Sequence, residues 1–195
     1  MKSKKNRIVF LSSLLVLFIL ISGCGRPIKN VDPKQVLFLQ NNIHTQEHTN
    51  TGEYRASYAN WTDPGKGHVI IPVNTLVTVD RFKSGFALIL QSTQKSILFE
   101  VNEKNAGMST EEYVRLIISP QAVELDRFSE IDRKGIQEGK AYVGMTKEGV
   151  RIALGYPARH KTPSLENNTW YFWTNRFRAF PVEFDENGMV KSVGN

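Results

Sequence analysis

The stretch over residues 144–190 constrains the fold of this chain most, because it sets one helical pattern beside several strand-forming runs. A helix is expected to begin at Thr146, whose hydroxyl can accept hydrogen bonds from the free amides of the first turn. Gly155 can adopt the left-handed conformation that ends a helix. The aromatic run Thr169–Trp173 favours a β-strand, and two more strand-like runs follow it. This order predicts a helix packed on an antiparallel meander, which is a scaffold rather than a catalytic motif.

The beginning of the chain has the pattern of an export signal. Four basic residues precede an apolar run over residues 8–21, which is shorter than the ~18 residues needed to span a bilayer. A secretory signal peptide is therefore predicted over residues 1–23. It ends in Ser22-Gly23-Cys24, which resembles the bacterial lipobox, and this resemblance implies lipidation of Cys24. Within this resemblance, Gly25 after the cysteine implies that the protein is sorted to the outer membrane and faces the periplasm. The alternative to a lipoprotein signal is a plain membrane anchor with an incidental cysteine.

The predicted signal peptide changes what the charge of the chain implies. The whole sequence carries 25 basic and 19 acidic residues, a net charge of +6. Residues 1–23 hold four of the basic residues and no acidic ones, so the mature chain is close to neutral, at +2. A nucleic-acid partner is therefore not expected. Cys24 is the only cysteine, which excludes disulfides, a thiol nucleophile and a zinc–thiolate site.

The mature chain divides by pattern into four parts. Residues 24–34 are polar and without periodicity, and they are expected to form a tether. Residues 35–104 contain short apolar runs separated by turn residues, which predicts a small β domain resembling an SH3-like barrel. Residues 105–128 include a capping box at Ser109–Glu112, which predicts a helix followed by a connector. Residues 129–195 contain two helical patterns and three strand-like runs.

The C-terminal part resembles the BamE (SmpA/OmlA) family of small outer-membrane lipoproteins. The matching residues are Gly144-Met145-Thr146, Val150, Leu154-Gly155, Pro157, Asn168-Thr169-Trp170, Phe184, Asn187-Gly188 and Val190. The resemblance implies a two-helix, three-stranded antiparallel domain and an accessory role in outer-membrane protein assembly, with contacts to protein and lipid head groups. The predicted fold class is therefore α+β, with an SH3-like β-barrel region followed by a BamE-like domain.

Aromatic and arginine side chains near the end of the chain are candidates for binding a partner. In the strand over 169–173 alternate side chains face opposite ways, so one pair of aromatic rings packs on the helices and the other needs cover. The β region can supply that cover, or the pair can form an exposed patch, since aromatic residues and arginine dominate interface hot spots. The predicted partner-binding residues are Tyr171, Trp173, Arg176 and Phe177. Pro181 cannot donate to a ladder, which predicts a bulge or an edge strand beside it.

No pattern indicates catalytic, cofactor-binding or metal-binding residues. The sequence lacks a Gly-x-Ser-x-Gly elbow, a His-Glu-x-x-His motif and a glycine-rich phosphate loop. His44 and His48 could share a helix face as metal ligands, but their polar surroundings favour solvated loop histidines and a third ligand is missing. The adjacent residues Glu111 and Glu112 are interpreted as charges that stabilise a helix N-terminus, rather than as a pair of carboxylates for general acid–base catalysis. The basic residues 159–161 are interpreted as solvated, with contact to lipid phosphates as the alternative.

The predicted function is that of a lipid-anchored, non-enzymatic protein of the cell envelope. Its expected partners are the membrane, through Cys24, and an envelope protein, with outer-membrane protein assembly as the setting that the resemblance implies. Two alternatives stay open. The protein could bind peptidoglycan through residues 35–102, or, ranked last, it could be an envelope hydrolase.

Overall fold

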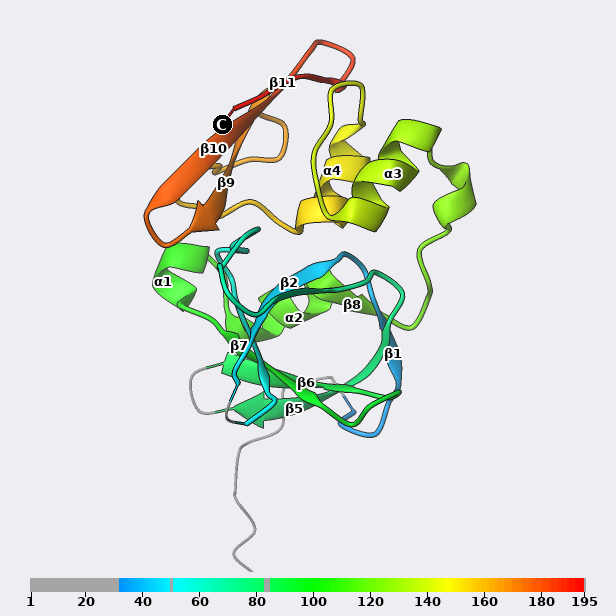
Figure 1. Ribbon diagram of the computed structural model, residues 1–195, viewed down its shortest axis with the longest axis vertical. Coiled ribbons are helices and arrows are strands. Elements are labelled where there is room, and N and C mark those ends of the chain that lie inside the picture. The colour runs from blue at the N-terminus through cyan, green and yellow to red at the C-terminus, as the bar shows by residue number, and fades with distance from the viewer. Residues whose placement is uncertain (1–31, 50, 83–84, 195) are drawn as a thin grey trace, which may run out of the picture.

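The computed structural model describes residues 32–49, 51–82 and 85–194 (Figure 1). The predicted signal peptide, Cys24 and most of the predicted tether lie outside these residues.

The N-terminal strands are β1 (Leu37–Leu39), β2 (Ile43–Glu47), β3 (Tyr54–Ser57), β4 (His68–Ile71), β5 (Leu76–Phe82), β6 (Gly85–Leu90) and β7 (Ser96–Glu100). The middle elements are α1 (Glu103–Ala106), α2 (Thr110–Ile117), β8 (Ile118–Ser119) and the 3-10 helix η1 (Leu125–Arg127). The C-terminal elements are α3 (Glu130–Glu138), α4 (Lys147–Leu154), β9 (Thr169–Asn175), β10 (Arg178–Phe184) and β11 (Val190–Val193). Within the described ranges, no helix combines the length and the apolar character needed to cross a membrane.

Eight strands form one curled, mixed sheet in the order β4-β2-β3-β7-β6-β5-β1-β8 (Figure 1). Neighbouring strands are antiparallel except β3 and β7, which run parallel with Tyr54 opposite Ile97. Strand β8 follows α2 directly and pairs with β1, placing Ser119 opposite Phe38. The curled sheet therefore joins segments that lie far apart in the sequence.

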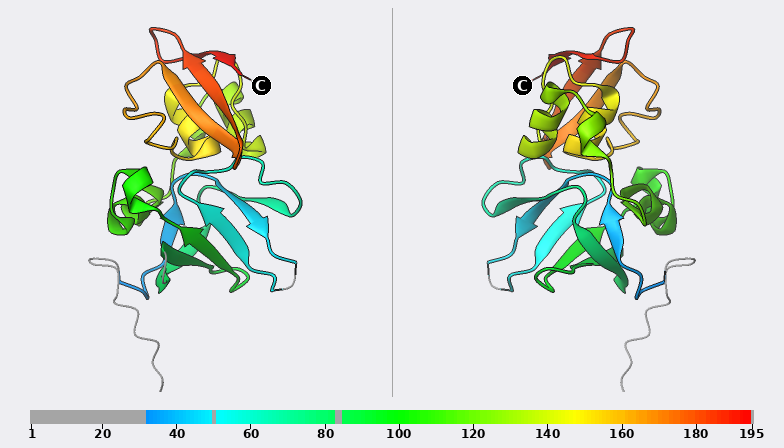
Figure 2. Two further views of the ribbon diagram at one scale, coloured as in Figure 1. Left: turned by 90° about the vertical axis from the view of Figure 1, so that its left-hand side faces the viewer. Right: turned by 90° about the vertical axis from the view of Figure 1, so that its right-hand side faces the viewer.

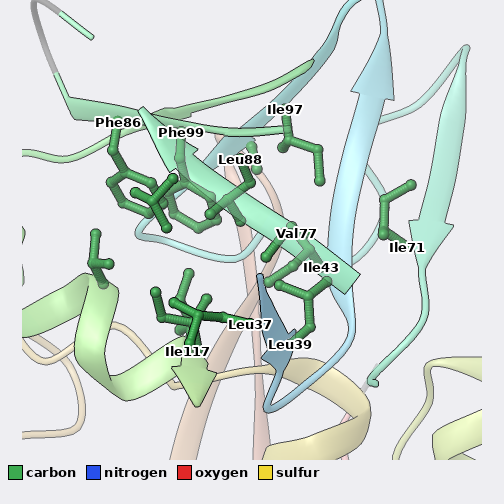
Figure 3. Close-up of a cluster of buried hydrophobic side chains, with 14 of the residues drawn as sticks. Leu37, Leu39, Ile43, Ile71, Val77, Phe86, Leu88, Ile97, Phe99 and Ile117 are labelled. Carbon is green, nitrogen blue, oxygen red and sulfur yellow. The ribbon is translucent and has the colours of Figure 1, made fainter. Parts of the chain in front are cut away.

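The inner face of the curled sheet encloses the first hydrophobic core (Figure 3). Phe86 and Phe99, on adjacent strands, stack with their ring centroids 4.9 Å apart. The ring of Tyr113 on α2 packs against Phe99 at 5.4 Å, so this helix covers the core. The predicted start of α2 is confirmed, because the side chains of Ser109 and Glu112 form a reciprocal capping box.

The second core lies between helices α3 and α4 and the three-stranded sheet β11-β10-β9. Helix α4 begins at the predicted cap and ends at the predicted glycine, but the ψ of Gly155 (−167°) lies outside the left-handed helical conformation that was predicted. The Thr146 hydroxyl accepts a hydrogen bond from the Gly149 amide at 2.9 Å, and Gly155 has a φ of +80°. Figures 1 and 2 show this C-terminal unit stacked on one end of the curled sheet, while the described chain begins at the other end.

A buried carboxylate joins the two C-terminal helices. Asp132 on α3 is completely buried and accepts hydrogen bonds from the Thr146 amide and the Ser129 hydroxyl, each at 2.8 Å. A Cβ added to Gly149 would lie 2.0 Å from the Asp132 carboxylate oxygen. The packing of α3 on α4 therefore requires glycine at position 149.

The fold class predicted from the sequence is wrong. Within the described residues the protein is sheet-rich, with an eight-stranded mixed sheet, a three-stranded sheet and only four short α-helices. It is not an SH3-like barrel followed by a two-helix, three-stranded BamE-like domain. The predicted connector over 105–128 contributes β8 to the large sheet. The C-terminal elements are also hydrogen-bonded to the N-terminal region, since the Asn42 side chain donates to the Ile136 carbonyl oxygen at 2.6 Å. These pairings are long-range, and local periodicity carries no information about them.

Candidate functional site

Strand β9 separates its four aromatic side chains between two environments. Trp170 and Phe172 are buried in the second core, at 2% and 1% exposure. Tyr171 and Trp173 face the other way, and Tyr171 is 39% exposed. The pair that packs on the helices is therefore Trp170 and Phe172, an assignment that the alternation alone left open.

The N-terminal region covers part of Trp173. Trp61 forms a parallel β-bridge with Trp173, and the Thr62 amide donates to the Trp173 carbonyl oxygen at 2.8 Å. The ring of His160 lies 5.9 Å from the Trp173 ring. The N-terminal region therefore covers Trp173 in part, which is one of the two predicted alternatives, and the residue is only partly exposed.

Of the two alternatives predicted near Pro181, a bulge or an edge strand, the edge strand is wrong, because β10 is the central strand of its sheet. The register of β10 against its neighbours shifts at two places instead, after Arg178 and after Glu183. The Pro181 carbonyl oxygen accepts a hydrogen bond from the Gly194 amide at 2.8 Å, just past the end of β11. The nitrogen of a strand residue faces the same side as its carbonyl oxygen, so the missing N–H faces the end of β11 and interrupts no bond of the β9–β10 ladder.

The turn between β9 and β10 exposes a large apolar ring. Phe177 is 88% exposed, more than any other large apolar residue in the described chain. Its amide donates to the Asn175 side-chain oxygen at 3.0 Å, which holds the turn in shape. The Arg176 guanidinium lies 5.7 Å from the Phe177 ring centroid, and Arg178 is also exposed. We call Arg176, Phe177 and Arg178 the hairpin tip.

A cleft of about 600 Å³ opens beside Trp173, where the hairpin meets the β3–β4 loop and helix α1. We call it the aromatic cleft and define it by Tyr58, Trp61, Glu100, Asn105, Trp173 and Arg176. The structure therefore brings together two of the predicted binding residues, Trp173 and Arg176. It places Phe177 at the tip next to the cleft, and Tyr171 outside both.

A second hollow, of about 240 Å³, adjoins the aromatic cleft. The two share Ser57, Trp61 and Glu100, and the second hollow adds Gln46 and Arg55. Trp61 thus lines two neighbouring depressions.

The basic residues 159–161 do not form a single cluster. The Arg159 guanidinium donates to the Gly107 carbonyl oxygen at 3.0 Å, which fastens this loop to the end of α1. His160 lines the aromatic cleft, and Lys161 is exposed. All three residues are exposed, as predicted for solvated side chains, although Arg159 and His160 also contact neighbouring residues.

His44 is buried in β2, so the interpretation of a solvated loop histidine is wrong for this residue. Its Nδ1 lies 3.1 Å from Nε2 of His68, and its Nε2 lies 3.1 Å from the Ala153 carbonyl oxygen. Both contacts are hydrogen bonds if neutral His44 donates from Nε2 and accepts from His68 at Nδ1. Burial lowers the pKa of His44 from 6.5 to about 4, and it also lowers the pKa of His68. No group of three metal-ligating side chains is found in the part of the chain that the structure describes.

The aromatic cleft does not assemble an activated nucleophile from the described residues. Ser57, His160 and Glu100 all line it, but no hydrogen bond joins any two of these side chains, and the Ser57 hydroxyl accepts one from the Ala59 amide. A catalytic serine needs a base within hydrogen-bond reach. The residues that line the cleft offer aromatic rings and polar groups.

Sequence reasoning missed Trp61, Glu100 and Asn105 as neighbours of Trp173. Only Trp61 gives a signal, since an aromatic residue next to the turn-rich segment 62–67 lies in a loop, where binding residues concentrate. No protein-family model, curated protein or solved structure matches this chain.

Proposed function

We propose that this chain is a lipid-anchored, non-enzymatic protein of the bacterial envelope that docks on a partner protein through its hairpin tip. The observation that carries the proposal is the 88% exposure of Phe177 on a turn that is held in shape. Burying a Phe side chain contributes about 1.5–3 kcal/mol, so leaving it in water forgoes this energy unless a partner covers it.

The two arginines beside Phe177 favour a protein partner. Arg176 and Arg178 are exposed and flank Phe177 in the sequence, and the Arg176 guanidinium lies near the ring. Arginine and aromatic residues are enriched in interface hot spots, where a central apolar anchor is surrounded by polar contacts. The hairpin tip has this composition on a small scale.

The predicted anchor is compatible with docking at this tip. Cys24 lies eight residues before Asp32, where the described chain begins, and such a segment reaches roughly 25 Å when extended. The C-terminal unit, which carries the hairpin, lies at the end of the curled sheet away from Asp32 (Figure 2). An anchor at Cys24 would leave this unit facing away from the membrane.

The motif resemblance of residues 144–190 to BamE indicates where a partner should be sought. It suggests the machinery that inserts outer-membrane proteins. This part of the proposal rests on the sequence alone.

The proposal is tested by the size of the complexes that the protein forms in detergent-solubilised envelopes. Wild type is expected to migrate in a complex, and Phe177→Ser is expected to migrate as the free protein. Val143→Ser is the matched control, because Val143 is also an exposed apolar residue, at 63%, but lies in the α3–α4 loop. It should leave the complex intact.

A complex that survives Phe177→Ser, or that Val143→Ser dissociates equally well, would contradict docking at the hairpin tip. The anchor is tested separately with Cys24→Ser. This variant should lose labelling by radioactive palmitate and leave the membrane fraction, whereas an unchanged distribution would contradict lipidation.

A further inference from the structure

The aromatic cleft exposes planar rings and hydrogen-bonding groups side by side. Tyr58, Trp61 and Trp173 are each partly exposed along it. Indole and phenol rings offer flat apolar faces, which stack on another flat or weakly apolar surface. A ligand that matches these rings therefore presents flat C–H faces.

The polar groups of the cleft are available to a ligand. Neither the Glu100 carboxylate nor the Asn105 side chain has a hydrogen-bond or ion-pair partner in the described structure, and both are exposed. The carboxylate accepts hydrogen bonds, the amide both donates and accepts, and the Arg176 guanidinium donates. This set matches hydroxyl and amide groups, which also donate and accept.

The shape of the cleft favours a chain of several units. The adjoining hollow of about 240 Å³ shares Ser57, Trp61 and Glu100 with the cleft, and Gln46 and Arg55 add polar groups there. A linear ligand that extends past Trp61 would meet polar groups in both depressions.

The backbone of the cleft argues against an added peptide strand at β9. The amides of Thr62 and Asp63 already donate to the carbonyl oxygens of Trp173 and Thr174, each at 2.8 Å. β-strand addition requires an edge with free backbone groups, and this part of the β9 edge has none to offer. Recognition in the cleft must rely on side chains.

We propose that the aromatic cleft is a binding site for an oligosaccharide chain. Pyranose rings combine flat C–H faces with hydroxyl and acetamido groups at their edges, which is the combination that the cleft matches. Two sources share this chemistry, namely chains of N-acetylated amino sugars, as in the bacterial cell wall, and chains of simple hexoses. Phe177 lies outside the cleft, so different variants test the two proposals, although Arg176 belongs to both surfaces.

Intrinsic fluorescence tests the proposal directly, because two of the three tryptophans in the chain line the cleft. The probes are the tetramer of N-acetylglucosamine and maltotetraose, titrated into the purified full-length protein in a detergent without a sugar head group. Saturable quenching at up to millimolar concentration is expected for at least one probe. Quenching by the amino-sugar tetramer alone would identify the cell-wall type of chain, and quenching by maltotetraose alone the hexose type.

Three variants locate the binding site. Trp61→Leu keeps an apolar side chain but removes the ring, and Asn105→Ala removes an exposed amide without removing a fluorophore. Each is expected to weaken binding about tenfold. Trp170→Phe is the matched control, because Trp170 is a tryptophan buried in the second core, and it should leave the affinity unchanged. Absence of quenching with both sugars, or wild-type affinity in both cleft variants, would overturn the proposal.

Discussion

Acid should destabilise this protein through one buried histidine. His44 is 3% exposed, and burial keeps its pKa at about 4, whereas the same side chain in the unfolded chain titrates at 6.5. Between these values the unfolded chain binds a proton that the folded chain does not. The stability that comes with neutral His44 is therefore fully present above pH 6.5 and is lost as the pH falls towards 4.

The size of this effect follows from the two pKa values. Each pH unit between 6.5 and about 4 corresponds to about 1.4 kcal/mol, so the loss sums to about 3 kcal/mol. That is a large fraction of the 5–15 kcal/mol typical of a folded domain. Protonation of His44 would also prevent its Nδ1 from accepting a hydrogen bond from Nε2 of His68, which lies 3.1 Å away. The neighbouring His68 titrates as well, so the contribution of His44 has to be isolated by substitution.

The assay is urea unfolding at a series of pH values between 7 and 4, followed by tryptophan fluorescence. His44→Gln can still donate to the Ala153 carbonyl oxygen but does not titrate, so its unfolding free energy should fall by about 3 kcal/mol less than that of wild type over this range. His48→Gln, at an exposed histidine of the same segment, should behave as wild type. Parallel pH profiles for wild type and His44→Gln would refute the argument.

Three further substitutions test other parts of the structure. Gly149→Ala should destabilise the protein by about 2 kcal/mol or more despite the higher helix propensity of Ala, because its Cβ would lie 2.0 Å from the Asp132 carboxylate oxygen. Gln137→Ala, at an exposed position of α3, should be nearly neutral, and equal melting temperatures of the two variants would contradict this reasoning. Asp132→Ala should cost about 1–3 kcal/mol in chemical unfolding, since it leaves the partly buried Thr146 amide without its acceptor, and a neutral effect would disprove that role. Phe177→Ser should change the unfolding free energy by less than about 0.5 kcal/mol, because the ring is 88% exposed, and a larger loss would mean that the ring supports the fold.

The sequence predicted those features that depend on residues close together in the chain. The capping box at Ser109 and Glu112, the Thr146 cap and the stop at Gly155 are each set by groups within one or two helical turns. In local terms Gly149 weakens helix α4, because glycine has a low helix propensity. Its reason lies in Asp132, seventeen residues earlier, and becomes visible only when α3 packs on α4.

Features that depend on distant pairing could not be predicted. The parallel register of Tyr54 with Ile97 and the pairing of Phe38 with Ser119 define the curled sheet, but neither leaves a trace in local periodicity. His44 was misinterpreted for the same reason, because its partners His68 and Ala153 are supplied by β4 and α4.

The candidate site was predicted in part. Trp173 and Arg176 were identified because aromatic residues and arginine are typical of binding surfaces. Trp61 and Asn105 were not, since only the folded chain brings the β3–β4 loop and α1 beside β9.

Photo-crosslinking in living cells tests the central claim, partner docking at the hairpin tip, most directly. A photoreactive phenylalanine analogue would replace Phe177, and in a parallel strain Val143, followed by mass spectrometry of the adducts. The account predicts one dominant protein adduct from position 177 and none of the same protein from position 143. Adducts to lipid alone, or the same background of proteins from both positions, would contradict it.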